Sequence, residues 1–182
     1  ASNCDEFLAR VRRETGLSLE LISGQEEAQL GFMGCAPLMN PRRPYALVFD
    51  IGGGSTEISW LQIKGGHRPR ALDSLSLPFG VVTLAERYAA EAKARTGQDS
   101  KSLLPDAYAA IRRDMADALA DFEQRNRVAF HQSQAKVQLI GTSGTVTTLS
   151  ALVQGLPRYD RSRVDGAYLT LGAIERICQQ LT

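Results

Sequence analysis

The sequence has few of the residues that bind transition metals or cross-link small secreted domains. Its 182 residues include three cysteines and two histidines. Cys4, Cys35 and Cys178 lie far apart, and no Cys or His pair has the spacing of a zinc site. An odd number of distant cysteines also does not suit a disulfide framework. We therefore expect reduced thiols and a cytoplasmic protein.

Excess charge of one sign and long apolar runs are lacking too. Lys and Arg number 21 against 20 Asp and Glu, which gives a net charge of +1 at pH 7. The chain therefore lacks the basic field of nucleic-acid-binding proteins, and we expect no nucleic-acid partner. No run of 18 apolar residues and no signal peptide is present, so we expect no membrane contact. The hydrophobic content of 43% is enough to bury a core.

Apolar periodicity and turn residues predict an α/β domain with a mixed sheet. An antiparallel three-strand unit comes first and strand–helix units follow it. The expected strands are 17–22, 45–50, 57–64, 71–77 and 136–140. The expected helices are 3–14, 24–33, 84–95, 103–127, 146–154 and 171–181, and 156–165 is expected to be a loop.

The stretch from Asp50 to Glu57 carries the strongest functional signal. It follows an apolar strand and contains three consecutive glycines, then two hydroxyl residues: Gly52, Gly53, Gly54, Ser55 and Thr56. Glycines let backbone N–H groups face a ligand without side chains in the way. Asp50 at the strand end can hold a metal ion. The stretch predicts a phosphate and Mg²⁺ site, and the alternative is a hairpin turn in which Asp50 only forms the turn. The two readings are compatible.

A second glycine-rich turn follows the strand predicted at 136–140. It reads Gly141, Thr142, Ser143, Gly144 and Thr145. The helix expected after it would offer free N–H groups to an anion. Without further context, an ordinary strand-to-helix connection with Thr145 as the N-cap is equally good.

Two adjacent glutamates compete for a chemical role. Ser23 begins a capping box, in which Glu26 is the N3 residue and caps the helix. Glu27 lies on another face of that helix and is free to meet a phosphate. Its position alone favours a solvated helix glutamate. Glu57 can assist a metal or face solvent on the next strand.

Together these stretches resemble the Ppx/GppA family of exopolyphosphatases and guanosine pentaphosphate phosphohydrolases. Five stretches match in the family's order: 22–28 (ISGQEEA), 48–57 (VFDIGGGSTE), 76–82 (SLPFGVV), 84–87 (LAER) and 141–145 (GTSGT). The resemblance implies a lobe of the RNase H-like fold found in actin-like ATPases. It also implies Mg²⁺-assisted hydrolysis of a terminal phosphoanhydride, in inorganic polyphosphate or in pppGpp.

The resemblance also assigns the site residues. Glu27 is expected to activate water, while Asp50 and Glu57 hold the metal. The phosphate-binding residues are expected to be Gly52, Gly53, Gly54, Ser55, Thr56, Gly141, Thr142, Ser143, Gly144 and Thr145. Arg158, Arg161 and Arg163 either steer polyphosphate or are simply solvated.

The family's first phosphate loop, of the Asp-x-Gly-(Ser/Thr)-Asn-Ser type, is not in this sequence. We therefore expect a fragment that has little activity without the missing first lobe of the same protein. Residues 1–36 would be the tail of that lobe, 37–170 the second lobe, and 171–182 the start of a returning helix. The resemblance also allows a homodimer. One alternative is a non-catalytic sensor that binds polyphosphate or (p)ppGpp. Another is a sugar-kinase or Hsp70-like ATPase lobe, although the segment 23–28 is not typical of those families.

Overall fold

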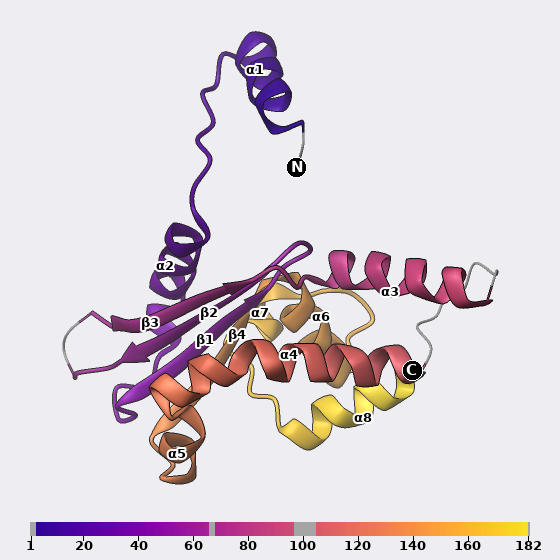
Figure 1. The fold of residues 1–182 in the computed structure, drawn as a ribbon. Coiled ribbons are helices and arrows are strands. Elements are labelled where there is room, and N and C mark those ends of the chain that lie inside the picture. The colour runs from indigo at the N-terminus through magenta and orange to yellow at the C-terminus, as the bar shows by residue number, and fades with distance from the viewer. Residues whose placement is uncertain (1–2, 66–67, 97–104, 182) are drawn as a thin grey trace.

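A mixed sheet lies at the centre of the computed structural model, which describes residues 3–65, 68–96 and 105–181. Its strands are β1 (Tyr45–Ile51), β2 (Thr56–Gln62), β3 (Arg70–Leu77) and β4 (Val137–Thr142), in the order β3-β2-β1-β4 (Figure 1). β1, β2 and β3 pair antiparallel, and β4 pairs parallel to β1. The predicted mixed α/β sheet is confirmed.

Helix α2 packs on one face of this sheet and α4 on the other (Figure 1). The helices of the described chain are α1 (Cys4–Thr15), α2 (Gly24–Cys35), the 3₁₀ turn η1 (Ala36–Leu38), α3 (Val81–Thr96), α4 (Pro105–Asn126), α5 (Val128–Ser133), α6 (Ser143–Val153), α7 (Arg161–Val164) and α8 (Leu171–Leu181). In the described ranges, no helix is both long and apolar enough to cross a membrane.

The α4 face of the sheet carries the larger apolar core. Its buried members are Ile58, Trp60, Leu77, Phe122 and Val137. Apolar residues at helical spacing in α4, such as Met115 and Leu119, pack against them. The helix expected at 103–127 is therefore found as α4 and packs one face on the sheet; residues 103–104 lie outside the described residues.

The α2 face has a core of its own, made by Phe32, Cys35, Met39, Ala46, Val48, Leu61 and Ile63. Its helix residues come from the last turns of α2, and its sheet residues come from the middle and start of β1 and from β2. The first turns of α2 lie beyond these helix residues, with Gly24 close to Ser76 of β3 and Glu27 close to Asp50 near the end of β1.

The strand expected at 17–22 is wrong. The segment is extended, but it pairs with no strand in the part of the chain that the structure describes. Leu17, Leu19 and Leu21 are exposed, and α1 before them buries no residue and stands away from the sheet (Figure 1). Alternation gives a strand one apolar face, but a strand forms only where another strand accepts its hydrogen bonds.

Two helices begin earlier than expected. α3 begins at Val81 instead of residue 84, because the N–H groups of Val81 and Val82 donate to carbonyls of the glycine stretch. α6 begins at Ser143 instead of residue 146. Two short helices, α5 and α7, lie in segments for which no helix was expected.

Candidate functional site

Four polar side chains lie in one line across the sheet, one from each strand. In register, Asp50 of β1 stands opposite Glu57 of β2 and Thr142 of β4, and Glu57 stands opposite Ser76 of β3. Residues opposite each other in a sheet point to the same face. Ser76, Glu57, Asp50 and Thr142 are called the polar row below.

Hydrogen bonds join the polar row into two pairs. Thr142 Oγ1 donates to Asp50 Oδ2 over 3.0 Å, and Ser76 Oγ donates to Glu57 Oε1 over 3.1 Å. The carboxylates of Asp50 and Glu57 are thus held in place by neighbouring hydroxyls. Glu57 is only 4% exposed, which excludes the solvent-facing alternative for this residue.

Helix α2 brings Glu27 to the polar row. Ser23 caps the helix as expected: its Oγ accepts from the N–H of Glu26, and Glu26 Oε2 accepts from the N–H of Ser23 over 2.8 Å. Glu26 is therefore occupied as the N3 residue of the capping box. Glu27, the next residue, lines a small crevice together with Asp50, Glu57 and Thr142. Residues far apart in the sequence thus converge at one place.

The crevice concentrates negative charge. Burial raises the pKa of Glu27 most, and the charges of Glu57 and Asp50 raise it further. Among the described residues, none of the three carboxylates forms an ion pair with Lys, Arg or His. Glu27, Asp50 and Glu57, called the acidic cluster below, therefore have no described Lys, Arg or His that balances their negative charge.

The donor set is one of oxygen atoms, which suits a hard cation. No set of three or more His, Cys, Asp or Glu side chains within residues 3–65, 68–96 and 105–181 is placed to hold a metal ion. Mg²⁺, however, commonly binds through one or two carboxylates and completes its shell with water and phosphate oxygens. Asp50 and Glu57, side by side and uncompensated, fit that mode of binding.

The glycine stretch forms the hairpin turn between β1 and β2. The N–H of Gly52 donates to the carbonyl of Ser55 over 3.0 Å and closes the turn. Within the described chain, the N–H groups of Gly53, Gly54 and Ser55 donate no hydrogen bond. Thr56 is buried, and its hydroxyl donates to the carbonyl of Phe79. The stretch is thus a hairpin turn that also offers free backbone donors, so the hairpin and phosphate-site interpretations remain compatible.

The second glycine-rich turn joins β4 directly to α6. Thr145 is not the N-cap: Thr142 occupies that position, while Thr145 Oγ1 donates to the carbonyl of Ile51 over 2.8 Å. This bond ties α6 to the end of β1, beside the hairpin turn. Ser143 adopts φ 73°, a left-handed conformation that is costly for a residue with a side chain. Gly141 is needed for packing, since a Cβ there would lie 2.8 Å from the ring of Phe49.

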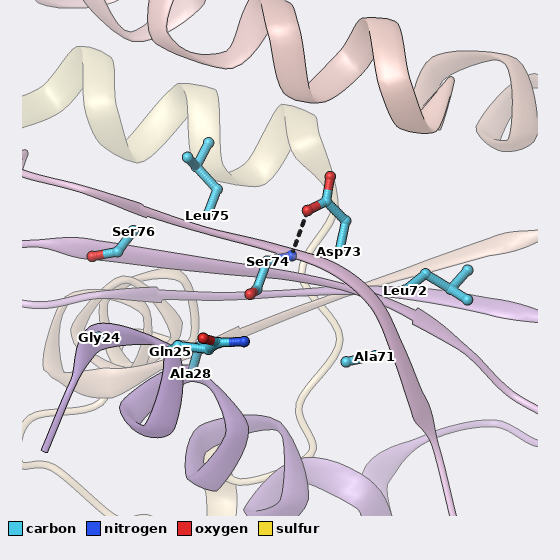
Figure 2. A pocket seen from close by; sticks show the side chains of 9 residues that line it. All are labelled: Gly24, Gln25, Ala28, Ala71, Leu72, Asp73, Ser74, Leu75 and Ser76. Carbon is cyan, nitrogen blue, oxygen red and sulfur yellow. Dashed lines mark hydrogen bonds between the residues drawn. The ribbon is translucent and has the colours of Figure 1, made fainter.

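A groove of about 450 Å³ runs between the first turn of α2 and strand β3. Figure 2 shows its lining residues, with Gln25 on the helix side and Ser74 on the strand side. Ser76 lines the groove and also bonds to Glu57, so the groove leads to the polar row. The family motifs assign Ser76 no role in the site, although alternation in 71–77 puts Ser74 and Ser76 on one face.

Comparisons with known proteins agree with the motifs. The model of the Ppx/GppA phosphatase family matches residues 1–182. Exopolyphosphatase 2 of Mycobacterium tuberculosis is 33% identical over 191 residues, covering 98% of this chain and 51% of that protein. A bifunctional 3-dehydroquinate synthase/phosphatase of Fusobacterium nucleatum is 27% identical over 171 residues, covering 93% and 23% respectively.

The fold agrees as well. The crystal structure of the Aquifex aeolicus Ppx/GppA family member aligns with a TM-score of 0.68 at 27% identity, over 99% of this chain and 51% of that one. The chain thus spans about half the length of the exopolyphosphatase and of the Aquifex protein. With the family model matched over all of its residues, the chain belongs to the Ppx/GppA phosphatase family.

Proposed function

We propose that this chain forms one wall of the active site of a phosphohydrolase that removes the terminal phosphate from inorganic polyphosphate or pppGpp. The observation that carries the proposal is the placement of Glu27. This glutamate meets Asp50 and Glu57 in one crevice, although it comes from a different element. Its pKa is raised, first by burial and then by the charges of Glu57 and Asp50, and a raised pKa makes a carboxylate a stronger base.

Each part of the site has a task in such a reaction. Glu27 orients the attacking water and takes its proton. The free N–H groups of Gly53, Gly54 and Ser55 bind phosphoryl oxygens and stabilise their growing charge. Asp50 and Glu57 would hold Mg²⁺, which neutralises phosphate charge when bound. Thr142 and Ser76 keep the two carboxylates in position.

Relatives support the same reaction class. A family relative with 33% identity is an exopolyphosphatase. Because that relative is about twice as long, we propose that residues 1–36 end a first lobe and that the other wall of the site comes from that lobe. The 182-residue chain alone would then have little activity, and the intact protein would be active in the cytoplasm.

The decisive variant is Glu27→Gln in the intact protein. Loss of the base should lower kcat by about 10²- to 10⁴-fold, measured as phosphate release from polyphosphate with Mg²⁺. Glu26→Gln is the matched control, because glutamine also fills the N3 position of a capping box. Full activity in Glu27→Gln would remove the base from the proposal. Omission of Mg²⁺ should abolish turnover in the wild type.

The sensor alternative makes a different prediction. A sensor would bind polyphosphate or pppGpp without releasing phosphate, whereas the proposed enzyme turns over at least one of them. Phosphate release measured on both substrates at fixed Mg²⁺ distinguishes these outcomes and also identifies the preferred substrate.

A further inference from the structure

The hairpin turn of the glycine stretch is held from outside by the start of α3. The N–H of Val81 donates to the carbonyl of Gly52 over 3.0 Å, and the N–H of Val82 donates to that of Gly53 over 2.9 Å. Thr83 adds its N–H, also to Gly53, and its hydroxyl lies 3.4 Å from the carbonyl oxygen of Gly54. A helix N-terminus thus binds three successive carbonyls of one turn.

The contact with α3 also fixes the direction of the N–H groups in the same peptides. In a planar trans peptide, C=O and N–H point in opposite directions. The carbonyls of Gly52, Gly53 and Gly54 belong to the same peptides as the N–H groups of Gly53, Gly54 and Ser55. When α3 binds the three carbonyls, the three N–H groups are directed away from α3. These are the N–H groups that donate no hydrogen bond among the described residues.

The same contact polarises the turn. The first N–H groups of a helix carry its positive partial charge, and they usually attract an anion directly. Here the carbonyls of the turn bind them instead. Hydrogen bonds in a chain strengthen one another, so a peptide whose carbonyl is bound becomes a better N–H donor. α3 would therefore act on an anion through the glycine turn.

Gly80 makes the approach possible. A Cβ at this position would lie 2.2 Å from the oxygen and 2.3 Å from the carbon of the Gly53 carbonyl, and 2.4 Å from the nitrogen of Gly54. These atoms are the backbone of the turn and cannot rotate away as a side chain would. Gly80 does not have a left-handed φ, so close approach is the reason for glycine here. Thr83 secures Gly80, since its Oγ1 accepts from the Gly80 N–H over 2.9 Å.

We propose that residues 79–83 form a clamp that positions the hairpin turn for anion binding, with Gly80 and Thr83 as positioning residues. The proposal rests on the proposed function, in which the turn binds phosphoryl oxygens. It adds that the direction of the donors is set by a segment that does not itself touch the phosphate. Phe79 belongs to the clamp because its carbonyl accepts from the hydroxyl of Thr56, at the end of the same turn.

The first test compares Gly80→Ala with Gly34→Ala in the 182-residue chain. A Cβ at Gly34, in α2, meets no atom within 4 Å. In ligand-free protein, Gly80→Ala should speed hydrogen exchange at the amides of Val81, Val82 and Thr83, while Gly34→Ala should not. Unchanged exchange in Gly80→Ala would overturn the clamp, and this readout does not depend on any catalytic activity.

The second test follows binding of pyrophosphate by the amide NMR shifts of Gly53, Gly54 and Ser55. Gly80→Ala should raise the apparent dissociation constant at least about tenfold, the order expected for one lost hydrogen bond to a charged group. Equal affinity in Gly80→Ala and wild type would overturn the clamp alone. If pyrophosphate moves none of these shifts in the wild type, the phosphate cradle of the proposed function fails as well.

Two substitutions of the exposed residue Thr83 test the clamp if Gly80→Ala does not fold. Thr83→Val removes the hydroxyl that bonds to Gly80 and lies near Gly54, and Thr83→Ser keeps it. We expect weaker pyrophosphate binding in Thr83→Val and recovery in Thr83→Ser. A merely structural role of the threonine would change thermal unfolding without changing pyrophosphate affinity, and that result would contradict the proposal.

Discussion

The two faces of the sheet differ in what they bury. Along β2, Ile58 and Trp60 face α4 and enter the aromatic core, whereas Glu57 and Ser59 alternate with them and face α2. All four side chains are buried. One strand therefore supplies an apolar surface on one side and a polar surface on the other.

The difference separates stability from chemistry. The α4 face buries aromatic and aliphatic area, which is the main favourable term in folding. The α2 face buries or crowds carboxylates that lack a cationic partner within the described ranges, and such groups cost free energy. We infer that apolar burial on the α4 face offsets the free-energy cost of the acidic cluster. Substitutions on the two faces should therefore change stability in different ways.

The largest expected difference is between two neighbouring residues of β2. Trp60→Ala should lower the free energy of unfolding by about 3–5 kcal/mol, because it empties the centre of the aromatic core. Ser59→Ala, equally buried but on the α2 face, should change it by less than about 1 kcal/mol. Urea unfolding of both variants measures the contrast. Similar losses in both would mean that the α2 face carries as much of the stability as the α4 face.

A second, smaller effect concerns the edge of the α4 face. Burial alone would raise the pKa of Asp73, but hydrogen bonds from Asn126 and Arg125 outweigh it and lower that pKa. A lowered pKa in the folded state contributes stability above the unfolded pKa, and that stability is lost as the pH falls through the folded pKa. Asp73→Asn should cost about 1–2 kcal/mol at pH 7.

The control for this variant is Asp121→Asn, which changes an exposed aspartate of α4, the helix whose Arg125 and Asn126 bond to Asp73. Thermal unfolding between neutral and acid pH should show a smaller acid loss in Asp73→Asn than in wild type or in the control. The same acid loss in all three would show that the bonds of Asp73 contribute nothing to the pH dependence.

The α4 face could be predicted from the sequence because its signal is local. The apolar positions of α4 recur at helical spacing, and the strands 45–50 and 71–77 were found within a residue of their ends. The glutamate at the N3 position could be assigned for the same reason, since a capping box spans only a few residues. Patterns of this kind depend on neighbours in the sequence.

The α2 face depends on register and on distant partners, which no local pattern contains. Ser76 meets Glu57 only because β2 and β3 pair in one particular register. The early start of α3 depends on acceptors in the hairpin turn. The segment 17–22 has a strand pattern but no described partner strand. The family motifs, by contrast, led to the prediction that Glu27 belongs to the site, which helix position alone did not favour.

The smallest predicted effect tests the acidic cluster itself. Burial, Glu57 and then Asp50 raise the pKa of Glu27, so Glu57→Gln should lower that pKa by removing the second cause. If Glu27 must be ionised to accept a proton, the acid side of the pH–activity profile of the intact protein then moves to lower pH, whether or not the maximal activity changes.

The pH dependence of stability tests the same pKa shift independently. A carboxyl whose folded pKa is raised contributes stability below its unfolded pKa and loses it as the pH rises through the folded pKa. Without divalent cations, Glu27→Gln should therefore melt at the same temperature as wild type in acid and higher above that pH, which is opposite in direction to Asp73→Asn. If both variants shift in the same direction with pH, the two faces do not differ in the way their charges suggest.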